Sequence, residues 1–235
     1  MGKLVAILQS NYIPWKGYFD LIRSVDEFIL YDEVQFTKRD WRNRNKIKTP
    51  DGIQWLTIPV EVKGKYFQRI NETLISDPAW AKNHWTRLKC AYGKAPFFKQ
   101  YQQMLESLYL GHDFKLISEV NELFIRKLCE VFGISTPIKQ STQYPTQTED
   151  PSERLLQICM QAKATCYVSG PAAKDYLNVD IFKSNGIAVE WMDYCGYQEY
   201  PQLNPPFDHY VSVLDLLLNV GPDAKAFMEK VRNAA

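Results

Sequence analysis

The sequence predicts an α/β fold with a mainly parallel sheet, flanking helices, a β-hairpin and a helical insertion. Two continuous apolar runs of strand length, "KLVAILQ" at residues 3–9 and "EFILYD" at residues 27–32, are typical of strands buried on both faces. Between them Trp15, Tyr18 and Ile22 recur at helical spacing. A strand, a helix and a strand within about 30 residues form a βαβ unit, whose strands run parallel.

The next stretch predicts the hairpin and the insertion. Residues 53–62, "IQWLTIPVEV", favour a strand, "KGK" at 63–65 is a turn signal, and residues 66–75 are the expected partner strand. Residues 79–133 then show helical periodicity in three segments that each end at a glycine, so we expect a helical insertion there.

The α/β pattern resumes after the insertion, and the rest of the chain continues the same sheet. A helix starts after Asp150 or Ser152, either of which can cap it. We find no low-complexity linker, so we predict a single domain over residues 1–235. The remaining expected strands are 136–142, 165–170 and 187–194, and the remaining helices are 150–164, one that starts at 171, 209–221 and 223–235.

Composition excludes several classes of protein. The formal net charge is +1, which argues against binding nucleic acid over the whole surface. No apolar run approaches the roughly 18 residues of a membrane span, and no signal peptide precedes the first strand, so we expect a cytoplasmic protein without membrane insertion. The five cysteines show no CxxC spacing, so we expect reduced thiols. The many Tyr and Trp residues suit a ligand cleft, a core or an oligomer contact equally, and the oligomeric state stays open.

Three loops follow expected parallel strands, at the edge of the sheet where ligands of such folds bind. They are "QSNYIPWKG" at 9–17, Asp32 with the basic loop after it, and "SGPAAK" at 169–174. We expect them to converge on one cleft. Gln9 and Asn11 offer hydrogen bonds there, and the start of the helix after Ser169 and Gly170, with Lys174 in its first turn, offers N–H groups to an anion.

The basic loop holds six cations between Lys38 and Lys48, interleaved with Trp41, Asn43 and Asn45. It is either a solvated connection or an anion-binding loop. Its place at the end of a buried strand favours the second interpretation.

Common catalytic and metal motifs are missing. The chain has no GxGxxG, Walker A, GxSxG or HExxH pattern, and His84, His112 and His209 stand singly, so we predict no metal ligands and assign no cofactor. Asp32 is the best candidate for a general base or a Mg²⁺-binding carboxylate. Asp215, inside an apolar helix, is either functional or part of a polar network.

The stretch "QSNYIPWKGYFDLI…DEFILYDEVQFTKRDWRNRNKIKTPDGIQWLTIPV" resembles the opening of the WbqC-like family, and "YVSGPAAKDYL", "GIAVEWMDY" and "VSVLDLLLNVG" fit its second half. Ser10 departs from the family pattern, which usually has proline there. The resemblance implies a role in surface-polysaccharide (O-antigen) synthesis and a suggested transfer of glycine or another amino acid to a sugar. The motif positions carried over are Gln9, Asn11, Tyr12, Trp15, Asp32, Gln35, Asn43, Arg44, Lys48, Ser169 and Gly170.

These observations lead to one main hypothesis and three alternatives. The main one is a transferase for a nucleotide-linked amino sugar, in which Arg44, Lys48 and the helix start near Lys174 hold the diphosphate. Tyr12 or Trp15 would stack on a ring, and Asp32 would deprotonate the attacking amine. The alternatives are an RNA- or tRNA-binding module, a scaffold protein, and a nucleotidyltransferase-like protein. If the donor is an aminoacyl-tRNA, the protein would be both the transferase and the RNA-binding protein of these hypotheses.

Within the basic loop, Gln35, Asn43, Arg44 and Lys48 are motif residues, whereas Lys38, Arg39 and Arg42 are not. We therefore predict a ligand-facing subset and a solvated remainder. On this view Arg44→Ala abolishes ligand binding and Lys38→Ala is nearly silent.

Overall fold

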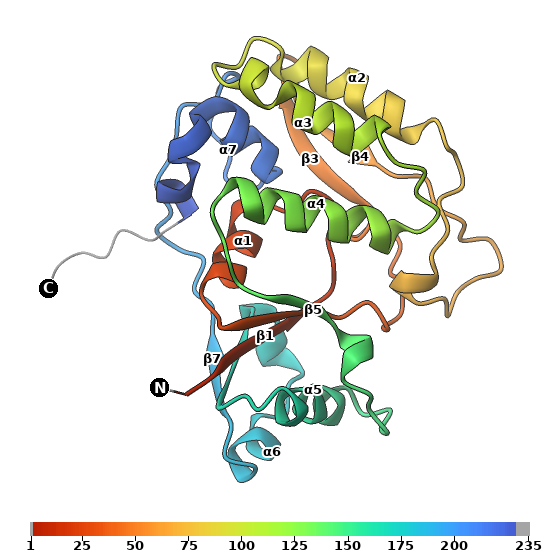
Figure 1. The fold of residues 1–235 in the computed structure, drawn as a ribbon, viewed down its shortest axis with the longest axis vertical. Helices are drawn as coiled ribbons and strands as arrows, with labels where there is room; N and C mark the ends of the chain where they lie inside the picture. The colour runs from red at the N-terminus through yellow and green to blue at the C-terminus, as the bar shows by residue number, and fades with distance from the viewer. Residues whose placement is uncertain (1, 229–235) are drawn as a thin grey trace, which may run out of the picture.

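The computed structural model describes residues 2–228 of the chain, and Figure 1 shows a parallel sheet at the centre of its lower half. The sheet has five strands in the order β5-β2-β1-β6-β7, and every neighbouring pair is parallel. The predicted α/β class is confirmed. The strands are β1 (Leu4–Leu8), β2 (Glu27–Leu30), β5 (Ile138–Gln140), β6 (Cys166–Ser169) and β7 (Ala188–Trp191).

The three central strands β2, β1 and β6 are buried on both faces, which explains their continuous apolar runs. Val5 and Ile7 of β1 join a cluster with helices α5 (Pro151–Gln161) and α6 (Val179–Ser184). Ala6 joins a larger cluster on the other face with α1 (Lys16–Arg23), α4 (Ile117–Val131) and α7 (Val213–Val220). A strand between two helical layers has no face left for polar residues. The α-helices are α1 (Lys16–Arg23), α2 (Trp80–Tyr92), α3 (Phe98–Leu110), α4 (Ile117–Val131), α5 (Pro151–Gln161), α6 (Val179–Ser184) and α7 (Val213–Val220).

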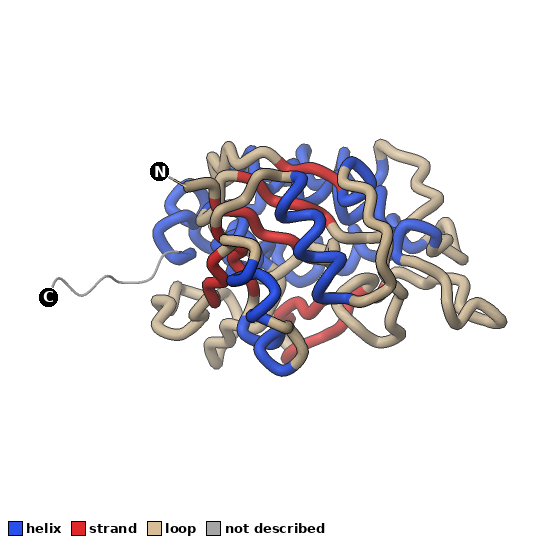
Figure 2. The backbone as a smooth tube through the Cα atoms, turned by 90° about the horizontal axis from the view of Figure 1, so that it is seen from below, coloured by secondary structure: helices blue, strands red, loops and turns tan. Residues whose placement is uncertain are grey.

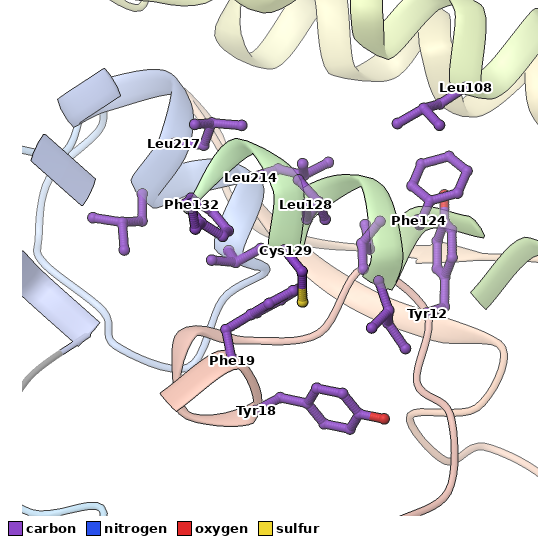
Figure 3. Packing of buried hydrophobic residues seen from close by; sticks show 14 of the residues in the cluster. Tyr12, Tyr18, Phe19, Leu108, Phe124, Leu128, Cys129, Phe132, Leu214 and Leu217 are labelled. Carbon is purple, nitrogen blue, oxygen red and sulfur yellow. The ribbon is translucent and has the colours of Figure 1, made fainter. Parts of the chain in front are cut away.

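The helices of the insertion form the upper part of Figure 1. Helix α4 lies next to the sheet, with α2 and α3 beyond it (Figure 1), and the view from below in Figure 2 shows helices and long loops surrounding the strands. The larger cluster continues from α4 into α7, α1 and the loop after β1, as Figure 3 shows for Phe124, Leu214, Phe19 and Tyr12. The insertion therefore shares its core with the sheet.

The hairpin lies earlier in the chain than we predicted. β3 (Arg44–Thr49) pairs with β4 (Gly52–Thr57), so the second half of the basic loop is a strand. The turn between them is "TPDG", in which proline fixes one turn position and Gly52 has a positive φ of 99°. The expected partner strand at 66–75 was wrong. An isolated antiparallel bridge between Val60 and Ile75 is found there, followed by no further ladder in the described chain.

Two other expected elements differ. After Gly170 the chain makes the short 3₁₀ helix η3 (Pro171–Asp175) instead of an α-helix. The expected helix at 223–235 is a 3₁₀ helix, η4 (Gly221–Met228), as far as the described residues reach, and residues 229–235 lie outside them. Two further 3₁₀ turns are η1 (Ile70–Glu72) and η2 (Ser141–Gln143). Within residues 2–228, no helix is both long enough and apolar enough to cross a membrane.

Candidate functional site

Two of the three predicted loops share one cavity at the carboxyl ends of the strands. Strand β1 lies between β2 and β6, so Gln9 after β1, Tyr31 after β2 and Ser169 at the end of β6 reach the same edge. They line a cavity of about 440 Å³ that the start of helix α5 closes. We call it the strand-end cavity; its other polar or aromatic lining residues are Glu149, Asp150, Ser152, Arg154, Tyr167 and Tyr176.

A second, smaller cavity of about 240 Å³ lies on the other side of the loop after β1. We call it the aromatic cavity, because Trp15, Trp41 and Tyr210 line it together with Pro14, Asn11 and Asn45. The Trp15 and Tyr210 ring centroids are 5.8 Å apart. The Trp15 indole lies against Gly17, where a Cβ would come within 2.3 Å of the ring. Only glycine at position 17 allows the indole to take this place.

The Arg42 side chain connects the two cavities. Its guanidinium donates one hydrogen bond to Gln9 Oε1, which borders the strand-end cavity, at 2.5 Å, and another to Asn11 Oδ1, which borders the aromatic cavity. The Arg42 side chain is 12% exposed, and Asp40 forms an ion pair with it at 3.5 Å. The buried Nε–H of Arg42 has no hydrogen-bond acceptor among the described residues. A buried cation with a free donor is suited to holding an anion.

The loop between the cavities is strained and held from several sides. Ile13 has a φ of 37°, which is unusual for a β-branched residue. The Asn45 amide donates to the carbonyls of Tyr12 and Ile13 at 3.1 and 2.9 Å. Tyr12 N–H donates to the carbonyl of Trp41, and Pro14 accepts from the N–H of Val213. The residues around the two cavities are therefore fixed before any ligand arrives.

Asp32 lies behind this loop and not in either cavity. Its Oδ1 accepts a hydrogen bond from the N–H of Ser10 at 2.8 Å. Burial raises the pKa of the Asp32 carboxyl to about 6, and the Ser10 hydrogen bond and the charge of Arg42 act in the opposite direction. Asp32 borders a third cavity of about 230 Å³, which Glu33, Glu119 and Glu122 make acidic. The carboxylate is therefore available as a base near neutral pH, but on the far side of the loop.

A model of the WbqC-like protein family matches residues 9–227 of the sequence. The chain belongs to the WbqC-like protein family. A relative in Mycobacterium tuberculosis, the uncharacterized protein Rv1507c, is 48% identical over 230 residues, which cover 98% of this chain and 99% of that protein. No solved structure matches the chain significantly.

The motif residues of this WbqC-like protein fall into two groups. Gln9, Asn11, Trp15 and Ser169 border the two cavities. Tyr12 does not: its side chain is fully buried and its hydroxyl contacts His84 Nδ1 at 2.9 Å and the Tyr109 hydroxyl at 2.7 Å. No ligand ring can stack on Tyr12 in this arrangement.

The motif residues in the hairpin and in the loop before it mostly stabilise the fold. Asn43 donates to the carbonyl of Ile58 at 2.8 Å, and Gln35 donates to the carbonyl of Tyr66 at 2.8 Å. Arg44 points to the outer face of the hairpin, where its guanidinium carbon lies 4.1 Å from the centroid of the Trp55 ring.

Lys48 and Asp215 belong to a buried polar network far from the strand ends. Asp215 accepts hydrogen bonds from the Tyr92 and Tyr200 hydroxyls at 3.0 and 2.8 Å, and Lys48 Nζ donates to Gln202 Oε1 at 2.7 Å. Burial raises the pKa of Asp215 and lowers the pKa of Lys48. The polar-network reading of Asp215 accounts for all of these contacts.

The remaining candidate residues are placed as follows. Gly170 precedes η3 directly, and Lys174 Nζ lies 5.8 Å from the centroid of the Trp191 ring instead of in a cavity. Burial lowers the pKa of His84 to about 4, so its imidazole is neutral at pH 7. In the part of the chain described, no three His, Cys, Asp or Glu side chains are arranged to hold a metal ion.

The structure adds four residues that the sequence did not single out for this site. Arg42 belongs to the predicted solvated remainder of the basic loop, because the family motif, which separates the cations of the run "KRDWRNRNK", favours Arg44. Arg154, Tyr31 and Tyr176 border the strand-end cavity. Tyr31 could have been found from its place at the end of a predicted strand, next to Asp32.

Proposed function

We propose that this WbqC-like protein is a transferase that acts on a nucleotide-linked amino sugar in surface-polysaccharide synthesis, with glycine or another activated acyl group as donor. The observation that carries the proposal is the Arg42 guanidinium, which contacts one residue of each cavity. Two neighbouring cavities whose walls are joined by one largely buried cation suit a reaction of two substrates, one of them anionic. The strand-end position of the larger cavity also agrees with where parallel sheets bind ligands.

The strand-end cavity suits the nucleotide-linked sugar. Its volume of about 440 Å³ lies in the range of small-ligand sites. Tyr31 and Tyr176 offer ring faces and hydroxyls, and the Arg154 guanidinium carbon lies 5.7 Å from the Tyr31 ring centroid. Arg154 lines the cavity and would hold the diphosphate by charge-assisted hydrogen bonds, with the charge of Arg42 behind Gln9, while the carboxylates of Glu149 and Asp150 would accept hydrogen bonds from sugar hydroxyls.

The transfer itself would form one amide bond. The nitrogen of the amino sugar would attack the carbonyl carbon of the donor, the C–O bond to the donor's leaving group would break, and the amine would lose one proton. Asp32 is the proposed acceptor of that proton, since a carboxyl with a pKa of about 6 is mostly ionised at pH 7.5 and can still bind a proton. Because Asp32 lies behind Ser10, this step requires the proton to pass the loop after β1.

A thermal-shift assay with nucleoside diphosphates, nucleotide sugars and nucleotide amino sugars tests the proposal. We expect at least one nucleotide amino sugar to raise Tm, because a ligand that binds the folded state alone stabilises it. Arg42→Gln should abolish the shift. Lys38→Gln, an exposed cation in the same loop, should leave it unchanged.

Three results would count against the proposal. If no compound of the panel raises Tm, the chain does not bind this class of ligand. If Arg42→Gln and Lys38→Gln reduce the ligand-induced rise in Tm equally, the buried cation Arg42 has no specific role in ligand binding. If Arg44→Gln alone abolishes it, the ligand-facing cation is the one that the motif pattern predicts, and the site lies on the hairpin.

A further inference from the structure

The outer face of the β3–β4 hairpin carries two exposed indoles side by side. Trp41 is 39% exposed and Trp55 is 37% exposed, and their ring centroids are 5.4 Å apart. Single exposed apolar side chains are common, but exposed apolar side chains that lie together within a polar rim mark binding surfaces. Strand alternation and the pairing of Lys46 with Trp55 place Arg44, Lys46 and Trp55 on the same face. We call Trp41, Arg44, Lys46 and Trp55 the hairpin platform.

The platform is positively charged. The Arg44 guanidinium carbon lies 4.1 Å and Lys46 Nζ lies 5.5 Å from the Trp55 ring centroid. Within residues 2–228, neither cation has a carboxylate within ion-pair distance. The nearby Asp40 is paired with Arg42. Lys38 and Arg39 add two exposed cations in the loop before the hairpin.

The platform continues into the aromatic cavity. Trp41 belongs to both, since its ring contacts Trp55 and also lines the cavity with Trp15 and Tyr210. A flat ring could enter the cavity while the next ring lies over the indoles outside it. Asn11 lies at the cavity wall with its Oδ1 held by Arg42, so its amide nitrogen is the group that would meet the edge of a heteroaromatic ring.

Alternating rings and negative charges are the chemistry of a single-stranded nucleic acid. We propose that the hairpin platform and the aromatic cavity bind its unpaired end. One base lies in the cavity against Trp41, the next packs on the exposed part of the Trp41–Trp55 pair, and Arg44 and Lys46, which lie over the Trp55 ring, contact the phosphates between them. A duplex hides the faces of its bases, and a sulfated polysaccharide has no flat rings, so neither matches the whole surface. The proposal goes beyond the transferase function and does not depend on it.

Fluorescence anisotropy with labelled RNA and DNA hexanucleotides over a range of salt concentrations tests the proposal. For single strands, each released counterion contributes a slope of about −0.7 in log K against log salt. The double variant Arg44→Gln/Lys46→Gln should therefore lower the magnitude of the slope by about 1.4. Trp41→Leu should weaken binding by about tenfold with little change in slope, because it removes stacking and no charge.

Lys183→Gln is the matched control, since Lys183 is an exposed cation on α6, at the opposite end of the molecule from the hairpin (Figure 1). The Lys183→Gln variant should bind the hexanucleotides with the same affinity and the same salt dependence as the unaltered protein. Circular dichroism and Tm of each variant show whether it is folded, and a misfolded Trp41→Leu is replaced by Trp55→Leu, for which the same result is expected.

The proposal is overturned if no hexanucleotide binds at about 50 mM salt. It is also overturned if Trp41→Leu and Trp55→Leu are folded and bind normally, or if heparin or a duplex binds as tightly as the single strand. The two proposals fail separately, because the Arg44→Gln/Lys46→Gln variant should keep its response to nucleotide amino sugars.

Discussion

At the scale of single residues, the protein keeps a carboxylate where burial disfavours its charge. Asp32 is 9% exposed, and its pKa is raised from the ordinary 3.8 to about 6, which corresponds to about 3 kcal/mol. Between pH 3.8 and about pH 6, the folded state therefore binds more protons than the unfolded state. The stabilising contribution of this group is present below pH 3.8 and is lost as the pH rises through 6. Above pH 6 an ionised Asp32 lowers the stability of the fold.

We therefore predict that Asp32→Asn stabilises the protein at pH 7.5, by up to about 3 kcal/mol, and that the gain disappears near pH 4. Urea unfolding at both pH values measures it, with Asp175→Asn on the exposed η3 helix as the control. Lower stability of Asp32→Asn at both pH values would contradict the raised pKa. A variant that is more stable but inactive in transfer would agree with a carboxylate kept for catalysis.

The positions of single side chains were the features least predictable from the sequence. Tyr12 carries a family motif and the features of a stacking residue, but His84 and Tyr109, which bury it, come from the insertion. Arg42 lies among five other cations, and its hydrogen bonds to Gln9 and Asn11 exist only once the sheet and the hairpin have met. Side-chain direction of this kind depends on contacts between distant segments.

At the scale of elements, the hairpin positions the loop after β1 through Asn45. We predict that Asn45→Ala lowers the free energy of unfolding by about 2 kcal/mol, because two carbonyls lose their donor and the unusual conformation of Ile13 loses its support. It should also reduce the Tm shift caused by a bound ligand. Chemical unfolding and the thermal-shift assay measure the two effects.

Asn43→Ala is the matched control for this prediction. Asn43 is equally buried and lies two positions away, but its side chain bonds Ile58 across the hairpin and not the loop. It should lower stability without changing the ligand response. If both variants reduce the ligand-induced Tm shift equally, Asn45 does not position the loop for ligand binding.

The elements themselves were mostly readable in the sequence. Buried parallel strands such as β1 and β2 need continuous apolar runs, and α5 is capped by Asp150, whose side chain accepts a hydrogen bond from the N–H of Glu153. The hairpin was misplaced because β3 carries Arg, Asn and Lys where a strand usually carries β-branched residues. Its turn residues, "TPDG", were the better signal.

At the scale of the whole molecule, one buried cluster joins parts of the chain that the sequence separates. It contains Phe28 of the sheet, Ile47 of the hairpin, Leu88 and Phe124 of the insertion and Leu217 near the C-terminus. We predict that the protein unfolds in one calorimetric transition, with equal van't Hoff and calorimetric enthalpies. Two separate transitions, or stable folding of an isolated 79–133 fragment, would contradict a single domain.

The contacts around Ile13 have a consequence for the order of events during synthesis. Residues 9–17 are synthesised before the groups that hold them, which come from Trp41, Asn45 and, last of all, Val213. A nascent chain can pair β1 with β2 early, whereas the loop between the two cavities has its final partner only when Val213 has been made. Ligand binding should therefore be absent from every nascent chain that stops before α7, however much of the sheet has formed.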